Sequence, residues 1–238
     1  HIIKYRIDGN YITQYLTGSW YKNLIVLNGN DILLFSNHSN NSGFNYVIFN
    51  AEKQQTTISW EPMKNEHFTY AMNPFSRIGN EVFATKAFDH TIYRFCGNNL
   101  CPYLNLEFAN TDKLPKAKTI LKKIETAGKV VDKIEDITRT NRNLCFSYSL
   151  KNNGRFMKYI CSIDSKNNLT ANVPMFNQAQ DAKFPVAGTF CSLTEGHCIM
   201  YLSVSEAQAL SGNGNFTPAD AEKLKNAGNL VILDYKLK

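Results

Sequence analysis

The chain has 238 residues, of which 43% are hydrophobic and 12% aromatic, and its formal net charge is +6. This length is enough to bury a large core in one or two domains, and the aromatic content favours β structure. The lysines are mostly spread along the chain and no nucleic-acid-binding motif is present, so the sequence predicts no nucleic-acid partner. It contains no run of about 18 apolar residues, so it predicts no membrane span.

Short apolar segments separated by tight polar turns recur along the chain. The first, IIKYRIDGNYI over residues 2–12, predicts a hairpin, and an Asn-Gly pair is a strong signal for a second one. In chain order, the predicted turns lie at Asp8-Gly9, Asn28-Gly29, Asn50, Gly79-Asn80, Gly97-Asn98, Asn141–Asn143, Asp164–Asn168 and Glu195-Gly196. Every second turn closes a similar apolar and aromatic pattern, so the repeating unit is four short strands over roughly 40 to 50 residues.

A repeating four-stranded unit of this length predicts an all-β fold, a β-propeller of antiparallel blades that forms a single domain over residues 1–238. An irregular β-sandwich is the alternative, although a sandwich does not require the long repeat. About four blades are visible, and the first hairpin is the outer half of a blade. Because His1 is neither methionine nor the start of a signal peptide, we expect a processed or trimmed product, such as the C-terminal portion of a longer chain.

Two segments interrupt the strand pattern. Leu114–Lys129 has an early proline, a late glycine and isoleucines along one side, which predicts an amphipathic helix. It belongs to a lysine-rich stretch from Lys113 to Lys133, which we expect to be a surface helix with solvated lysines. Phe216–Asn229 carries capping signals and predicts a second helix. The terminal segment 229–238 predicts a strand that pairs with an earlier blade and protects its edge.

Three stretches carry a resemblance to a known family. They are DHTIYRF over residues 89–95, YLNLEFANTDKLP over 103–115 and the ending AGNLVILDYKLK over 227–238. Through them the chain resembles the six-bladed β-propeller family of uncharacterised lipoproteins from gut anaerobes, which is related in architecture to NHL-like and TolB-like propellers. Leu230 stands where that family usually has proline.

The resemblance implies a six-bladed ring, export to the periplasm or cell surface, and a lipid anchor upstream of this sequence. A six-bladed ring would need roughly 80 to 150 further residues before His1. The family has no shared catalytic motif, so the resemblance implies neither an activity nor a cofactor.

All six cysteines are disulfide candidates, because an even number in an exported chain permits disulfides. By spacing they form three local pairs, Cys96 with Cys101, Cys145 with Cys161, and Cys191 with Cys198. The alternative is six buried thiols that pack as small apolar groups. No cysteine or histidine spacing suits zinc and no acidic loop suits calcium, so the sequence predicts no metal and no cofactor.

Seven residues are candidates for ligand binding. Loops and inner strands on one face of a propeller surround a concave centre, so the turn RTNRN over residues 139–143 is a candidate whose side chains suit a carboxylate or sugar hydroxyls. The alternative is a solvated turn. A histidine beside Asp89 is expected to be exposed at a strand entry. The full set is Arg77, Lys86, His90, Arg139, Asn141, Arg142 and Tyr148.

The sequence contains no recognised catalytic motif, since HExxH, a GxSxG elbow and a phosphate loop are all missing. We therefore predict a non-enzymatic exported module that binds a protein or carbohydrate ligand through one propeller face. Two alternatives stay open. One is a propeller enzyme, a carbohydrate lyase or a hydrolase of lactonase type, with catalytic residues spread over several blades. The other is a structural subunit of a cell-surface complex that uses an exposed blade edge as its interface.

Overall fold

A computed structural model gives the fold and describes residues 1–36, 43–62, 73–109, 111, 128–152, 155–175, 189–194, 197–203, 205, 222–223 and 230–236. Within these ranges the chain forms seventeen strands. Helical residues in the same ranges are Ser205, Glu222 and Lys223. Every strand pairing is antiparallel. The predicted all-β class is therefore confirmed.

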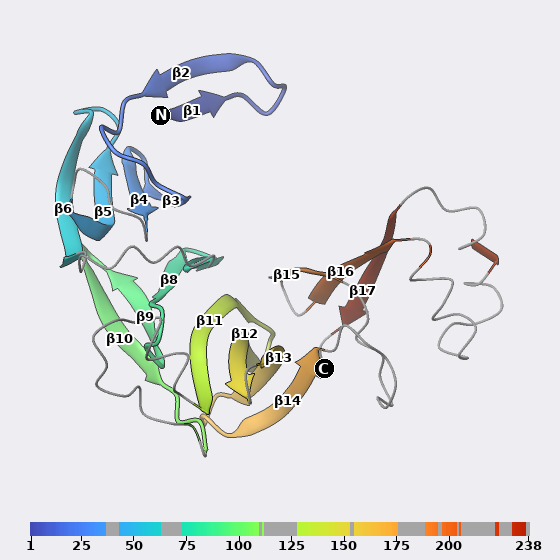
Figure 1. Cartoon of the computed structure of the whole chain (residues 1–238). Coiled ribbons are helices and arrows are strands. Elements are labelled where there is room, and N and C mark those ends of the chain that lie inside the picture. Colours follow the sequence, from blue (N-terminus) through green and yellow to red (C-terminus); the bar gives the residue numbers. More distant parts are fainter. Residues whose placement is uncertain are drawn as a thin grey trace.

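The strands form five sheets that follow one another in chain order along an arc (Figure 1). The first sheet is a hairpin of β1 (Ile2–Tyr5) and β2 (Tyr11–Tyr15). The next is made of β3 (Asn23–Asn28), β4 (Asp31–Phe35), β5 (Phe44–Asn50) and β6 (Gln55–Pro62). It is followed by β7 (Phe75–Ile78), β8 (Glu81–Thr85), β9 (Thr91–Cys96) and β10 (Asn99–Asn105). A third four-stranded sheet has β11 (Lys129–Arg139), β12 (Asn143–Asn152), β13 (Arg155–Asp164) and β14 (Leu169–Met175). The last has β15 (Thr189–Thr194), β16 (His197–Ser203) and β17 (Leu230–Lys236).

The first strands of successive sheets are neighbours. Strand β3 contacts β7, β7 contacts β11, and β11 contacts β15. In each four-stranded sheet the other strands lead away from the first strand in chain order. Figure 1 accordingly shows β6, β10 and β14 on the convex side of the arc. The sheets are thus arranged side by side, with their first strands on the inner side.

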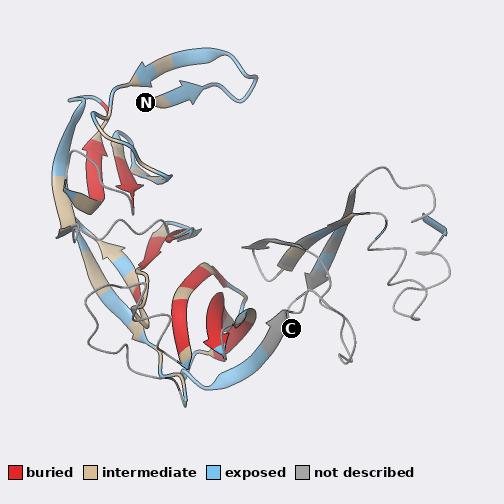
Figure 2. Ribbon diagram, viewed as in Figure 1, coloured by how far each residue is buried: buried red, intermediate tan, exposed pale blue. Residues whose placement is uncertain are grey.

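The core lies between the sheets, and strands β4, β5, β8 and β12 are buried on both faces (Figure 2). On β4, Leu33 packs in a cluster with Phe75 of β7, whereas its neighbour Leu34 packs in another cluster with Tyr15 of the hairpin. Successive side chains of a strand point to opposite faces, so a strand buried on both faces needs a continuous apolar run. The sequence DILLF of β4 supplies such a run.

Tight turns connect most neighbouring strands. The predicted turns at Gly79-Asn80 and Gly97-Asn98 are the two-residue connections of β7 to β8 and of β9 to β10. Gly97 has a φ of 61°, a left-handed conformation that glycine adopts without steric strain. The turn between β3 and β4 lies one residue later than predicted, at Gly29-Asn30, because Asn28 pairs with Asp31 across the hairpin.

The predicted basic helix is wrong over Lys129–Lys133. These residues begin strand β11, in which Val130 and Val131 are buried and pair with β12. Consecutive β-branched residues favour this extended conformation over a helix. Residues 113–127 of the predicted basic helix lie outside the described residues.

The predicted C-terminal elements are described in part. Of the predicted helix Phe216–Asn229, the structure describes Glu222 and Lys223, and both are helical. The terminal strand was predicted to pair with an earlier blade, and this is wrong. Strand β17 pairs instead with β16 of its own sheet, in an unbroken register from His197↔Lys236 to Ser203↔Leu230. No described helix is long and apolar enough to cross a membrane.

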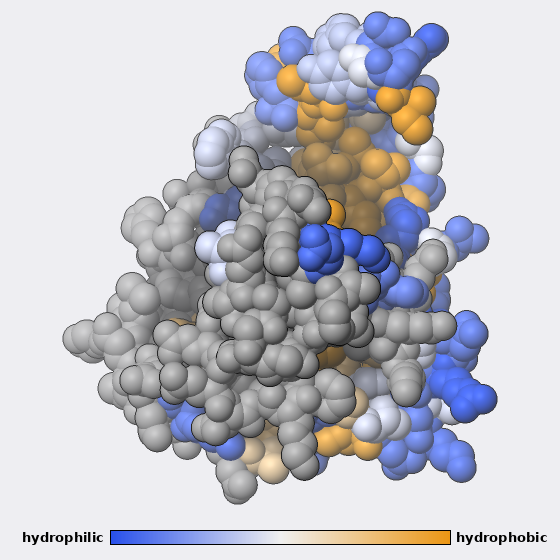
Figure 3. Space-filling view, turned by 90° about the vertical axis from the view of Figure 1, so that its right-hand side faces the viewer, coloured by the Kyte–Doolittle hydropathy of each residue, from blue (hydrophilic) through white to orange (hydrophobic). Residues whose placement is uncertain are grey.

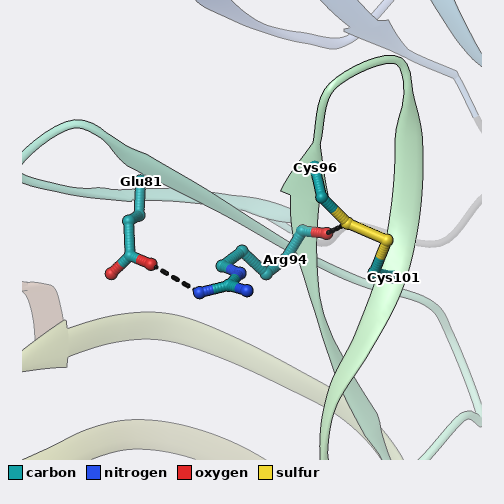
Figure 4. The surroundings of a disulfide bond; sticks show 4 residues. All are labelled: Glu81, Arg94, Cys96 and Cys101. Carbon is teal, nitrogen blue, oxygen red and sulfur yellow. Dashed lines mark hydrogen bonds and ion pairs between the residues drawn. A yellow bond between two sulfur atoms is a disulfide. The ribbon is translucent and has the colours of Figure 1, made fainter.

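A disulfide joins Cys96 and Cys101 across the turn between β9 and β10, with their Cα atoms 6.2 Å apart (Figure 4). Cys96 pairs with Asn99 in the antiparallel register, so Cys101, two residues further on, has its side chain on the same face. Beside the bridge, Arg94 of β9 forms an ion pair with Glu81 of β8 at 3.0 Å.

The predicted pairing of Cys145 with Cys161 is wrong, because both cysteines are buried free thiols. Cys145 lies opposite Ser162 and Cys161 lies opposite Phe146 in the register of β12 and β13. This offset of one residue places the two thiols on opposite faces of the sheet, where no disulfide can form. The side chains of Cys191 and Cys198 lie outside the described residues.

Removing the disulfide is expected to weaken the fold moderately. The bridge closes a loop with a sequence separation of 5, and the chain-entropy relation for so short a loop gives about 2 kcal/mol. The double substitution Cys96→Ser and Cys101→Ser should lower the free energy of unfolding in urea by that amount. Reductant should weaken the wild type equally and leave the double variant unchanged. A wild type whose unfolding curve is insensitive to reductant would contradict this role.

Candidate functional site

A candidate binding groove lies beside the β11–β14 sheet. Residues 103–109, which include the end of β10, form one wall together with Thr111, and strands β12, β13 and β14 form the other. The groove consists of two adjoining cavities. One, the polar cavity, has a volume of about 450 Å³, and the other, the aromatic cavity, about 580 Å³. Both are lined by Leu104, Ile163 and Asn167, so the two cavities adjoin each other.

Two polar turns build the floor of the polar cavity. In the β11–β12 turn, the Thr140 hydroxyl accepts hydrogen bonds from the backbone N–H groups of Arg142 at 3.3 Å and Asn143 at 2.9 Å. In the β13–β14 turn, the Asp164 carboxylate accepts the backbone N–H groups of Lys166 and Asn168, both at 2.8 Å. The hydrogen bonds from Asn168 hold the pKa of Asp164 below its ordinary value. Each turn is thus fixed by its own side chain.

Arg139 is held in place at one end of the polar cavity. Its Nη2 donates to the Tyr103 hydroxyl at 3.0 Å, and its Nη1 lies 3.4 Å from Oε2 of Glu81. The other Glu81 oxygen pairs with Arg94 at 3.0 Å. Because Glu81 and Arg94 belong to the β7–β10 sheet, this network ties that sheet to β11 and fixes the rim of the cavity.

Three other side chains of the polar cavity carry no such contacts. Asn141, Arg142 and Asn167 line it, and their side chains have no hydrogen-bond or ion-pair partner among the described residues. An amide can donate and accept, and a guanidinium presents five donors in a planar fork. The polar cavity therefore offers unused donors and acceptors on a rigid frame.

Stacked rings form the wall of the aromatic cavity. Tyr148 and Tyr159 stack with centroids 5.0 Å apart and planes 7° apart, and Phe108 lies 4.8 Å from Tyr148. The Tyr148 hydroxyl donates to Oδ1 of Asn172 at 3.0 Å. Burial raises the pKa of Tyr148, so the phenol stays protonated at neutral pH. The ring wall is apolar, with polar groups at its edge.

Cys161 also lines the aromatic cavity, but its thiol is not activated. Burial raises its pKa to about 12, and burial likewise raises the pKa of Cys145. Thiolate is the nucleophilic form of cysteine, so neither thiol is suited to attack a substrate at neutral pH. Among the described residues no group of three or more His, Cys, Asp or Glu side chains could hold a metal ion.

Four of the seven candidate residues come together in the groove. Arg139, Asn141 and Arg142 line the polar cavity and Tyr148 lines the aromatic one. His90 is half-buried rather than exposed, and its ring packs edge-on against Phe108 with centroids 5.0 Å apart. His90 thus supports the groove wall.

The other two candidates lie elsewhere. The Arg77 guanidinium donates to the backbone carbonyl of Val26 and so links β7 to β3. The ammonium of Lys86 lies 4.2 Å from the centroid of the Tyr93 ring, a cation–π contact. Phe108, Tyr159 and Asn172 carry no local motif and were not predicted. Tyr159 and Asn172 meet Tyr148 through the pairing of β12, β13 and β14, whereas Phe108 follows β10 and reaches Tyr148 by ring packing.

Comparison with known proteins shows the fold and no family. No family model matches the chain, and no curated protein matches it. The crystal structure of a "putative exported protein (BF0058)" from Bacteroides fragilis superposes with a TM-score of 0.69 at 19% sequence identity. The match covers 98% of this chain and 70% of that one. The two proteins therefore share a fold over almost all of this chain.

Proposed function

We propose that this chain is an exported β-propeller module that binds a ligand in the groove beside the β11–β14 sheet. Two observations support the propeller arrangement. Three consecutive sheets have four antiparallel strands in chain order, and their first strands are neighbours on the inner side of the arc. This is how blades surround the axis of a propeller. Export is supported by the structural neighbour, which is described as a "putative exported protein".

The observation that carries the binding function is the composition of the groove. Ligand sites are typically cavities of roughly 300–1,000 Å³ with an apolar or aromatic lining and a few convergent polar groups. The aromatic cavity has the stacked tyrosines, and the adjoining polar cavity has Asn141, Arg142 and Asn167 with unpaired side chains. Both lie on turns and strands that hydrogen bonds hold rigid, which favours binding by a preformed site.

A single substitution can fill the groove without disturbing the core. Ala109 is exposed and lines the aromatic cavity, so Ala109→Trp adds an indole at that point. Ala171 of β14 is also exposed but points to the opposite face from Asn172, so Ala171→Trp is the matched control. An array of neutral and acidic oligosaccharides and short peptides is probed with all three chains. We expect the wild type and Ala171→Trp to bind the same members and Ala109→Trp to lose them.

Two results would contradict this function. Equal binding by Ala109→Trp and wild type would place the ligand outside the groove. Turnover of a bound oligosaccharide by the purified chain, retained through independent preparations, would make the protein an enzyme of the lyase or hydrolase type instead.

A second candidate function, assembly through the first hairpin, is supported by the exposed apolar surface there. Nine of the fourteen large hydrophobic side chains that are exposed in the described chain fall between residues 3 and 26. They are Ile3, Tyr5, Ile7, Tyr11, Ile12, Leu16, Trp20, Leu24 and Val26. Figure 3 shows apolar surface on and below the hairpin at the top of the view. In addition, β1 pairs with β2 alone among the described strands, so its other edge can accept a further strand.

Light scattering after size-exclusion chromatography tests this second candidate. Association through the hairpin predicts a mass above that of one chain, rising with concentration, and a shift towards the monomer in Ile3→Lys. Ile232→Lys on β17 is the control, since Ile232 is 68% exposed but lies far along the chain from the hairpin. A wild type that stays monomeric at high concentration would argue against self-assembly.

A further inference from the structure

We propose that the ligand of the groove is an acidic sugar whose carboxylate is bound by Arg142. This inference rests on the proposed binding function and adds the chemical class of the ligand. It is carried by the charges of the polar cavity, by the unpaired side chains beside Arg142 and by the aromatic wall that adjoins them.

The described lining of the polar cavity carries more positive than negative charge. Arg139 and Arg142 line it, and the one carboxylate among its described lining residues is that of Asp164. Asp164 uses its oxygens within its own turn, accepting two backbone N–H groups and the side-chain amide of Asn168 at 3.1 Å. Glu81 is shared between Arg94 and Arg139. Neither carboxylate therefore serves Arg142, whose guanidinium has no partner among the described residues.

Arg142 suits a carboxylate better than a neutral group. Its backbone N–H is bound to the Thr140 hydroxyl, so the base of the side chain is fixed in the turn. A guanidinium binds a carboxylate through two parallel N–H···O bonds, and such charge-assisted bonds are about twice as strong as neutral ones. Arg142 therefore favours a ligand with an anionic group over the same ligand with a neutral group.

The remaining surface of the groove suits a sugar ring. Asn141 and Asn167 have unpaired amides in the polar cavity, and an amide can both donate to and accept from a hydroxyl. The half-buried rings of Phe108 and Tyr159, which pack on the buried Tyr148, line the adjoining aromatic cavity and can cover the C–H face of a ring. A carboxylate, several hydroxyls and one apolar face are the features of a uronic acid.

The test uses uronic-acid oligosaccharides of several linkages, each paired with its carboxyl methyl ester. The tightest-binding acid is titrated calorimetrically into the wild type, Arg142→Gln and Arg142→Lys, with Arg6→Gln on the first hairpin as the control of equal charge. We expect the ester to bind at least about tenfold more weakly than the acid to the wild type. Arg142→Gln should lose the same factor for the acid and nothing for the ester. Arg142→Lys should fall between, because an ammonium keeps the charge without the fork.

The outcomes separate this inference from the proposed function. If acids and esters bind equally, or if Arg142→Gln binds the acid as the wild type does, the carboxylate assignment is overturned. In that case the groove would still be a binding site if neutral ligands bind the wild type and Ala109→Trp abolishes their binding. If no oligosaccharide, acid or ester, binds to the wild type, the acidic-sugar assignment is overturned, while peptides bound in an Ala109→Trp-sensitive manner would still support the groove.

Discussion

Replacing Phe83 with alanine is expected to lower the free energy of unfolding by about 3–5 kcal/mol. Phe83 on β8 is fully buried and belongs to the cluster that joins the β7–β10 sheet to the β11–β14 sheet. Its ring also contacts that of Tyr103, with centroids 5.2 Å apart in an edge-on arrangement. Truncation therefore removes apolar contacts and leaves a cavity between two sheets that are both rigid, which limits relaxation.

The matched control for Phe83 is a phenylalanine on the surface. Phe156 on β13 is 53% exposed, so Phe156→Ala should change stability by about 0.5–1 kcal/mol at most. Urea unfolding followed by circular dichroism measures both variants under the same conditions. Equal losses in the two variants would mean that the interface between these sheets contributes little to the fold, contrary to the packing described here.

The second large effect is a gain of stability, expected when the Asp132 carboxylate is replaced by an amide. Asp132 lies at a bulge in β11 and is 2% exposed. Its Oδ1 has no hydrogen-bond partner among the described residues. Burial raises the pKa of Asp132 from 3.8 to about 6, although Ser149 and Lys133 act in the opposite direction. The ionised carboxylate is thus poorly compensated in the folded chain.

The direction of the pH effect follows from proton uptake. The folded state holds the Asp132 proton up to pH about 6, whereas the unfolded state releases it near pH 3.8. Between these values the folded state binds more protons, so this group makes stability fall as pH rises, and above pH about 6 its cost is constant. At about 1.4 kcal/mol for each pKa unit, the full cost is about 3 kcal/mol.

Asp132→Asn should remove this cost. We expect the variant to be more stable than the wild type by up to about 3 kcal/mol at pH 8, and nearly equal to it at pH 4. Asp136→Asn is the control. Asp136 accepts hydrogen bonds from Ser147 at 2.6 Å and Lys158 at 3.0 Å, so loss of its charge should destabilise the folded chain at pH 8. Urea unfolding at both pH values decides, and an Asp132→Asn chain less stable than wild type at pH 8 would refute the explanation.

Local signals in the sequence predict the sheets well. Turns such as Gly79-Asn80 and Gly97-Asn98 depend on glycine and asparagine at fixed offsets, so they form where the residues stand. The alternation and the apolar runs between turns then determine which strands are buried on one face or on both. The helix prediction fails over Lys129–Lys133, because another local signal there favours a strand. The isoleucines that precede this stretch have helical spacing, but Val130 and Val131 form backbone pairs with β12 and belong to the sheet.

Register is the property that local signals do not give. Cys145 and Cys161 are on consecutive strands, as predicted, but a one-residue offset places them on opposite faces. The groove was predictable only where local composition marks it, and not where strand pairing brings distant residues together. The turn at residues 139–143 stood out by composition, whereas Phe108 and Tyr159 reach Tyr148 only through pairings across three strands and the packing of the next sheet.

Hydrogen–deuterium exchange with and without the tightest oligosaccharide from the array tests the central claim most directly, because it locates the bound ligand on the chain. Binding in the groove predicts slower exchange in peptides that cover residues 103–111, 139–144 and 163–172. Peptides of the first hairpin, residues 1–20, should be unaffected. Protection confined to the hairpin, or to any segment outside the groove, would contradict the site described here.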